Sequence, residues 1–292
     1  MVILLLVSFV GFLAQVIDGS MGMAFGISST TLLLLLGYSP ALASATVHLA
    51  EIGTSFASGL AHIRYKNVDW HALVKVGVPG AAGALLGAIA LSSVDLNQAK
   101  PWTASILLIL GCVLVYRFTR PVILGTKRRA RARWLGPLGL VGGLVDSTGG
   151  GGWGPIVTTS LTASNALEPR KAIGTTNTAE FLVSIFASIG FLIGLGYSNI
   201  PWQEVLALLL GGLLAAPLAA WLVSKAPRRI MGVFVGAVVV SLNLFSLLLI
   251  FEVSRFATVI VMFLTLTVIT SAVFRALAFS RIEHNNGGKI LP

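Results

Sequence analysis

The sequence predicts an all-α polytopic membrane protein made of two inverted-topology repeats and one extra C-terminal helix. Hydrophobic residues make up 56% of the 292 residues and charged residues only 10%, with a mean hydropathy of +0.92. The chain therefore has too little polar surface to cover a soluble globule. Apolar runs of about 20 residues recur along it and match the length of membrane-spanning helices. The two halves also repeat one pattern of glycines and polar residues.

A glycine-rich stretch interrupts the apolar sequence once in each half. Asp146–Thr159 contains four consecutive glycines, and Asp18–Thr31 in the first half aligns with it without a gap. Consecutive glycines interrupt a helix. Non-helical backbone at membrane depth survives only where it is buried in protein or lines a water-filled cavity. Two matched breaks therefore indicate a binding site near the middle of the membrane.

The apolar segments on either side of each break are too short to cross the bilayer alone, which takes at least ~17 residues. We therefore expect each pair of segments to form a re-entrant helical hairpin, over residues 1–37 and 134–164, and three transmembrane helices to follow each hairpin. The expected spans are residues 41–63, 72–91 and 102–119 in the first repeat (1–119), residues 170–196, 203–223 and 229–250 in the second repeat (134–250), and residues 255–279 as the extra span.

Positive charge sets the expected orientation. Lysines and arginines cluster in a linker over residues 120–133, and such an excess marks cytoplasmic loops. Counting crossings from this linker places the N-terminus outside and the tail over residues 280–292 in the cytoplasm, and the hairpins then enter from opposite faces. Loops of this kind explain the net charge of +10, so we expect no nucleic-acid partner. The expected location is the cytoplasmic membrane, and a homo-oligomer is possible.

The helix after each hairpin is expected to carry a polar stripe. Polar residues lie three or four positions before and after Glu51, and the pattern recurs around Glu180 in the second half, so each set shares one helix face. Acidic groups within spans are costly and mark functional sites. Glu51 and Glu180 are therefore candidates for proton coupling, with His48 as a further titratable group. The alternative is a structural role in which each Glu is neutral or hydrogen-bonded to its hairpin.

Asp18 and Asp146 stand at the start of the two breaks and are open to two interpretations. Either could take part in proton transfer, so both join the proton-coupling candidates. Either could equally cap the break by accepting hydrogen bonds from downstream N–H groups. A charged carboxylate beside a bound anion would repel it, which favours the capping role.

The backbone of the breaks is suited to hold an anion, because glycines leave N–H groups free and the start of the following helix adds partial positive charge. The alternative is that the glycines only let helices pack closely. The sequence has no Cys/His cluster, no phosphate-binding Gly-Lys-Ser/Thr loop and no Gly-x-Ser-x-Gly motif, so we expect no metal, no cofactor and no enzymatic activity. An intramembrane enzyme that uses Asp18 and Asp146 is a less favoured alternative.

At these residues the sequence resembles the sulfite exporter TauE/SafE permeases, also called the TSUP family. The resemblance rests on the paired glycine-rich segments with a leading acidic residue, the proline-alanine-threonine pattern that begins at Pro40 and Pro169, the basic linker and the two-half layout. It covers nearly the whole chain. It implies a proton-coupled secondary transporter of small sulfur-containing anions, such as sulfite, sulfoacetate or another organosulfonate. A passive anion channel on the same scaffold is the alternative.

By position, the resemblance implies a substrate region at the hairpin tips and on the helices that follow. The expected partners are then a small anion and the lipid bilayer. The first tip has methionines and Phe25 where the second has glycines and Trp153, so equal binding at both tips is not expected. The substrate-binding candidates are Gly22, Gly26, Ser28, Thr30, His48, Thr148, Gly149, Gly150, Gly151, Gly152, Trp153, Thr158 and Asn177.

Overall fold

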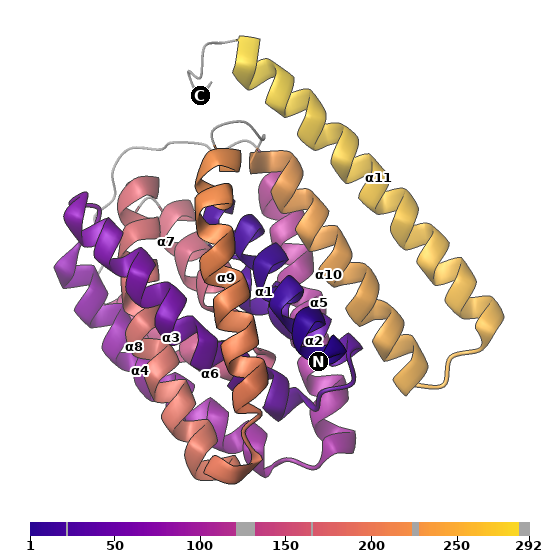
Figure 1. Cartoon of the computed structure of the whole chain (residues 1–292). Coiled ribbons are helices and arrows are strands. Elements are labelled where there is room, and N and C mark those ends of the chain that lie inside the picture. Colours follow the sequence, from indigo (N-terminus) through magenta and orange to yellow (C-terminus); the bar gives the residue numbers. More distant parts are fainter. Residues whose placement is uncertain (22, 121–131, 165, 224–227, 286–292) are drawn as a thin grey trace.

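The computed structural model describes residues 1–21, 23–120, 132–164, 166–223 and 228–285, and the regular structure of this part of the chain is entirely helical (Figure 1). Most of the expected linker, the end of the expected tail and Gly22 lie outside the described residues. The helices are α1 (Val2–Met21), α2 (Phe25–Leu35), α3 (Pro40–Arg64), α4 (Trp70–Ser93), α5 (Leu96–Phe118), η1 (Ala132–Trp134), α6 (Leu135–Gly149), the π-helical turn η2 (Gly154–Thr158), α7 (Thr159–Ala163), α8 (Pro169–Leu195), η3 (Tyr197–Asn199), α9 (Trp202–Val223), α10 (Arg228–Ile250) and α11 (Arg255–Asn285).

Five helices of the described chain, α4, α5, α8, α10 and α11, are long and apolar enough to cross a membrane. The protein is therefore a multi-pass membrane protein. α3 is also 25 residues long but more polar, because it carries His48 and Glu51. α5 begins at Leu96, earlier than the expected span at residue 102.

Local sequence signals set several helix starts. α3 begins with Pro40 at its first position, and Ser39 caps it by accepting a hydrogen bond from the N–H of Leu42 at 3.3 Å. Asp69 caps α4 in the same way, from the N–H of Ala72 at 3.0 Å. The short links between α2, α3 and α4 thus end in residues that favour a new helix.

The chain leaves the helical conformation only briefly at each break. In the first half, α1 ends at Met21 and α2 begins at Phe25. In the second half, α6 ends at Gly149, and Gly150 and Gly151 follow with φ values of +71° and +143°. Residues with a side chain rarely adopt such values, so α6 ends where glycine permits the turn.

Asp18 and Asp146 do not open the breaks as the sequence predicts. Both lie in the last turn of a helix, α1 and α6 respectively. The prediction is wrong by about one turn, because an aspartate near a helix end does not stop the helix, whereas a glycine with positive φ does. Each aspartate is therefore carried at the end of the helix that enters its break.

Helices pair across the two halves of the chain. α1 packs along α9 and α6 along α4, while α3 packs against α8 and α5 against α10. A Cβ atom at Gly11 of α1 would lie 2.2 Å from the carbonyl oxygen of Leu208, and one at Gly139 of α6 would lie 2.1 Å from that of Val76. The missing side chains bring the backbones of each pair together, as small residues do between membrane helices. Both α2 and η2 contact α5, and they are thus packed inside this arrangement.

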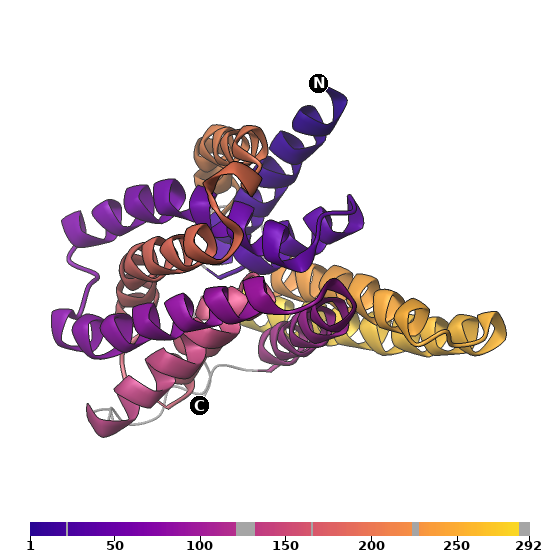
Figure 2. The same ribbon diagram turned by 90° about the horizontal axis from the view of Figure 1, so that it is seen from below.

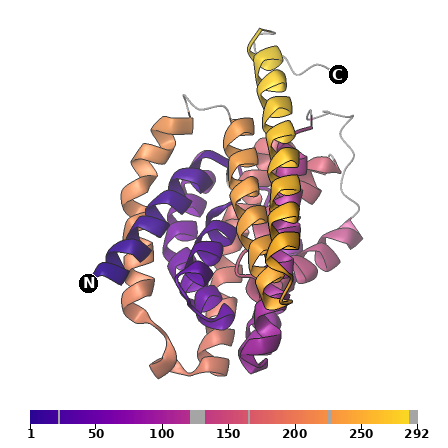
Figure 3. The ribbon, with the colours of Figure 1, turned by 90° about the vertical axis from the view of Figure 1, so that its right-hand side faces the viewer.

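α11 lies on the outside of the bundle. It runs beside α10 (Figure 3), and the two project from the other helices when the molecule is seen from below (Figure 2). Only 6% of its apolar membrane-spanning window is buried. A small cluster around Val233, Ala272 and Ala276 attaches it to α10, so most of α11 is left to face lipid.

Candidate functional site

The two breaks contact each other. Thr30 of α2 donates a hydrogen bond from its hydroxyl group to the carbonyl oxygen of Gly150. A Cβ atom at Gly26 would lie 2.8 Å from the Cα of Gly151, and one at Gly151 would lie 2.3 Å from the backbone nitrogen of Ile27. A side chain fits on neither side of this contact, so both positions require glycine. Two stretches from opposite halves of the sequence therefore form one region.

An aspartate carboxylate caps each break. Asp18 Oδ1 accepts hydrogen bonds from the N–H groups of residues 24 and 25, at 2.7 and 3.2 Å. Asp146 Oδ1 accepts hydrogen bonds from the N–H groups of residues 152 and 153, at 2.6 and 2.9 Å. This is the geometry that a capping role requires. It is the same in both halves, because the two pairs of N–H groups occupy aligned positions of the two breaks.

These bonds correct the expectation that the break N–H groups are free to hold an anion. At the four positions named above, the side-chain oxygens of the two aspartates accept from the N–H groups, so these donors are already occupied. A bound anion therefore has to use other donors. The hydroxyl of Ser28, which is buried and makes no hydrogen bond within the described residues, is one such donor.

His48 of α3 is fully buried and joins the first half to Asp146. Its Nδ1 lies 2.8 Å from the carbonyl oxygen of Ser44, and its Nε2 lies 3.1 Å from Asp146 Oδ2. A carbonyl oxygen can only accept, so Nδ1 carries a proton. The second contact holds one further proton, on the imidazole or on the carboxyl group. Within the described residues Asp18 has no such partner, so the two capping aspartates differ.

Glu51 of α3 and Glu180 of α8 border two small cavities beside the breaks. In the cavity that Asp18 also borders, the centre of a water molecule can occupy a volume of about 20 Å³. In the cavity that Asp146 also borders, this volume is about 10 Å³. One water needs roughly 10–15 Å³, so each cavity holds about one water and neither holds an anion of several heavy atoms. Glu51 Oε2 is buried there and has no hydrogen-bond partner within the described chain.

The structure brings most of the predicted site residues to this region. Thr30, Gly150 and His48 reach it through the hydrogen bonds given above. Ser28 follows Ile27, which borders the smaller cavity. The predicted residues that border the cavities are Gly26, Gly151, Gly152, Asn177, Asp18, Glu51, Asp146 and Glu180.

Four other predicted substrate-binding residues are turned to packing partners instead of the cavities. The indole N–H of Trp153, which is fully buried, donates to the carbonyl oxygen of Thr176 at 3.0 Å. The hydroxyl of Thr158 lies 2.7 Å from that of Thr176. Thr148 donates to a carbonyl of its own helix at 2.7 Å, and Gly149 packs against α5. The polar side chains among them are satisfied within the protein, which leaves them no free donor for a ligand.

Sequence reasoning missed three residues near the breaks. Ser44 donates from its hydroxyl to the carbonyl oxygen of Ser147 at 2.7 Å and supports the His48 contact. Gln15 borders the larger cavity. Arg117, which lies in the expected span over residues 102–119, bonds to Thr159 just after the second break. Gln15 is the only amide in its apolar segment, a signal that could have identified it.

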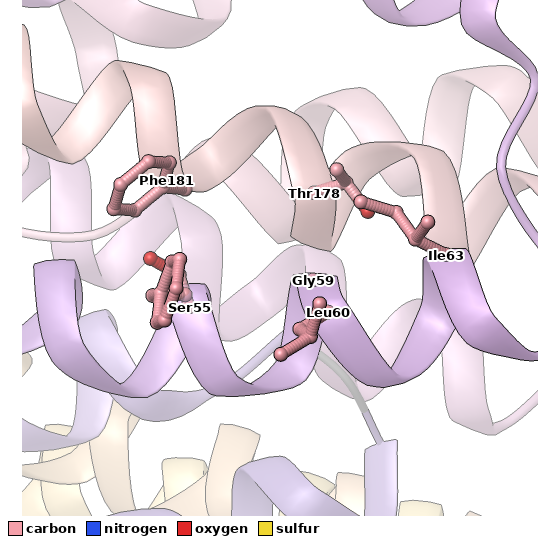
Figure 4. A pocket seen from close by; sticks show the side chains of 7 residues that line it. Ser55, Gly59, Leu60, Ile63, Thr178 and Phe181 are labelled. Atoms are coloured by element: carbon pink, nitrogen blue, oxygen red, sulfur yellow. The ribbon is translucent and has the colours of Figure 1, made fainter.

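A groove lies between α3 and α8 (Figure 4). It leaves about 180 Å³ for water centres, and its lining includes Ser55 of α3 and Thr178 and Phe181 of α8. Ser55 also borders the larger cavity, so this one side chain lies between groove and cavity. The amide of Asn177 donates to Ser58 at 3.3 Å and joins the two helices next to it.

Comparison with known proteins shows which family the chain belongs to. The family described as "Sulfite exporter TauE/SafE" matches residues 7–246. A Bacillus subtilis (strain 168) protein named "Probable membrane transporter protein YtnM" is 44% identical over 243 residues, 82% of this chain and 81% of the relative. A Haemophilus influenzae protein named "Probable membrane transporter protein" is 28% identical over 222 residues, 73% of this chain and 82% of the relative. No solved structure matches the chain. The chain is a membrane transporter, not an enzyme, and belongs to the sulfite exporter TauE/SafE family.

Proposed function

We propose that the chain is a proton-coupled secondary transporter of small sulfur-containing anions, such as sulfite, sulfoacetate or another organosulfonate. Its substrate site lies at mid-membrane where the two breaks meet. The observation that carries this proposal is the gathering of Asp18, Glu51, Asp146 and Glu180 around two cavities, the smaller of which borders both breaks.

Buried carboxyl groups and a bound anion are compatible only when protons bind as well. Two like charges about 4 Å apart repel by ~4 kcal/mol at an effective dielectric constant of ~20, so an anion beside ionised Glu51 and Glu180 would be expelled. A protonated carboxyl group is neutral and offers an O–H donor instead. The anion and the proton then favour each other's binding, which is the basis of coupled transport.

Neutral donors hold the anion in this proposal. Ser28, Ser58 and Asn177 supply hydroxyl and amide hydrogens near the cavities. Among the described residues, no lysine or arginine borders either cavity. An anion held without a fixed positive charge is bound weakly enough to be released on the other side.

The transport cycle that we propose is alternating access between two inverted repeats, each beginning with a re-entrant hairpin. The helix contacts support equivalence of the halves. In the alignment that matches the two breaks, Gly11 of the first half falls on Gly139 of the second. The residues that they contact, Leu208 and Val76, lie within a few positions of the same alignment. Because the cavities hold about one water each, substrate binding requires the breaks to separate.

The groove between α3 and α8 is the proposed route to the site from the cytoplasm. α3 ends at Arg64, and Arg170 and Lys171 lie in the first turn of α8, so positive charge surrounds one end of this helix pair. Positive charge at the mouth of a pathway concentrates anions there.

Uptake by proteoliposomes under an imposed pH gradient tests the proposal. We expect the wild-type protein to accumulate sulfite or sulfoacetate and a protonophore to abolish the accumulation. Glu180→Gln, which imitates the protonated form, should still bind substrate but lose one coupled proton. At a gradient of one pH unit a proton supplies ~1.4 kcal/mol, so accumulation should fall about tenfold.

Glu204→Gln is the matched control. Glu204 lies in the first turn of α9, accepts a hydrogen bond from Tyr38 at 3.1 Å and borders neither cavity, so accumulation should not change. Equal losses of substrate binding and of pH-driven uptake in Glu180→Gln would contradict a role in coupling. Flux through the wild-type protein that follows only the membrane potential would identify a passive channel instead.

A further inference from the structure

A much larger groove lies on the outer side of the bundle, between α11 and the α5–α10 pair. It leaves about 910 Å³ for water centres, compared with about 180 Å³ in the α3–α8 groove. Its lining shares no residue with the two carboxyl-bordered cavities. α11, which runs beside α10 (Figures 1 and 3), forms one wall of it. The groove is therefore separate from the proposed transport site.

The groove is apolar along most of its length and polar at one end. Leu108 of α5, Leu244 of α10 and Val261 of α11 line the apolar part. Tyr116 and Arg275 line the polar end, near the C-termini of α5 and α11. A groove with this gradient is complementary to an amphipathic molecule.

Positive charge at the polar end is available to a ligand. Arg275 is exposed and makes no hydrogen bond or ion pair with any described residue. Arg120 stacks over the ring of Tyr116, 4.8 Å from its centre, which brings a second cation to the same end. Together they make this end attractive to an anionic group.

We propose that this groove binds one anionic phospholipid, with its phosphate at Arg275 and its acyl chains along α11. A groove open to hydrocarbon loses dispersion contacts if it stays empty, and its apolar part offers water too few partners to be filled by water. Lipid chains are the apolar molecules that surround it.

The length of the groove fits one membrane leaflet. Val261 and Arg275 are separated by about 21 Å along α11, at a rise of ~1.5 Å per residue. Half of the hydrocarbon core measures ~15 Å. An acyl chain can therefore run from a phosphate at Arg275 to the middle of the bilayer without leaving the groove. Basic pockets between membrane helices are known to select anionic lipid head groups.

Native mass spectrometry of the delipidated protein with phosphatidylglycerol and phosphatidylcholine of identical acyl chains tests the proposal. We expect phosphatidylglycerol to bind more tightly to the wild-type protein. Arg275→Gln should weaken its binding about fivefold, the factor that corresponds to ~1 kcal/mol per basic residue, and should leave phosphatidylcholine unchanged. Arg255→Gln, at the opposite end of α11, should bind both lipids as the wild type does.

Ser271→Trp tests whether the lipid lies in the groove or only against a charged surface. Ser271 is exposed and lines the groove, so a tryptophan there should fill it and reduce the binding of both lipids. Equal affinity of the wild-type protein for the two lipids would overturn the proposal. Unchanged phosphatidylglycerol binding in Arg275→Gln or in Ser271→Trp would also overturn it, as would a lipid-free dimer as the main species.

Discussion

Gly151 combines a backbone conformation that favours glycine with a close neighbour. Its φ is +143°, and a Cβ atom there would lie 2.3 Å from the nitrogen of Ile27 and 2.4 Å from the carbonyl carbon of Gly26. We expect Gly151→Ala to push the two breaks apart and to destabilise the protein by about 2–6 kcal/mol, the sum of backbone strain and overpacking. Thermal unfolding in detergent, with and without sulfite, measures both stability and ligand-induced stabilisation.

Gly37 provides the matched control at residue scale. Its φ is +92°, but no atom lies within 4 Å of a Cβ built there. Gly37→Ala should therefore show the strain alone, about 1–2 kcal/mol, with ligand-induced stabilisation intact. If the two variants unfold at the same temperature, the contact between the breaks contributes nothing and the arrangement of the site is wrong.

The sequence could identify single site residues but not their partners. The position of Asp146 after an apolar run and before glycines indicates a cap, and its bonds to residues 152 and 153 are local. Its second partner, His48, lies in the other half of the chain on another helix, and no local pattern predicts such a contact. Trp153 shows the opposite error, because its place among the glycines suggested a ligand contact while its fully buried ring packs in the core.

At the scale of the helix, α6 and α4 depend on glycine for their close approach. A Cβ atom at Gly139 would lie 2.1 Å from the carbonyl oxygen of Val76, whereas the nearest atom to one at Gly136 is Pro79 Cγ, 4.0 Å away. We expect Gly139→Ala to destabilise the protein by about 1–3 kcal/mol. Gly136→Ala on the same helix should be neutral or slightly stabilising, because alanine favours a helix.

The unfolding midpoints of these two variants in detergent measure the difference. Each should be compared with its uptake activity, because a shift of α6 displaces Asp146 and the second break at its end. Similar midpoints for the two alanine variants would show that the backbones do not approach as closely as the structure has them.

Helix positions were predictable where apolar length decides them. α4, α8 and α10 fall on apolar runs of membrane-spanning length, and Asp69 marks the start of α4 as a cap. The ends of the breaks could not be predicted in this way, because the helix continues through Asp18 and Asp146 until the backbone turns. The π-helical η2, which begins at Gly154 before Pro155, has no counterpart in α2, and the near-identical pattern of the two stretches does not reveal this difference.

At the scale of the whole molecule, the proposed inverted repeats require equivalent links to lie on opposite sides of the membrane. Lys66, between α3 and α4, and Ser198, between α8 and α9, are both exposed. They occupy equivalent places in the two halves, because each directly precedes the same Asn-x-x-Trp pattern, at residues 67–70 in the first half and 199–202 in the second.

In a Cys112→Ala background, which removes the chain's one cysteine, we expect a membrane-impermeant maleimide to label Ser198→Cys in intact cells. Lys66→Cys should be labelled only after the membrane is permeabilised, because Lys and Arg near it mark a cytoplasmic link. Both variants should retain uptake, which controls for misfolding. Labelling of the two cysteines from the same side would mean that the halves run parallel, and alternating access between inverted hairpins would then be excluded.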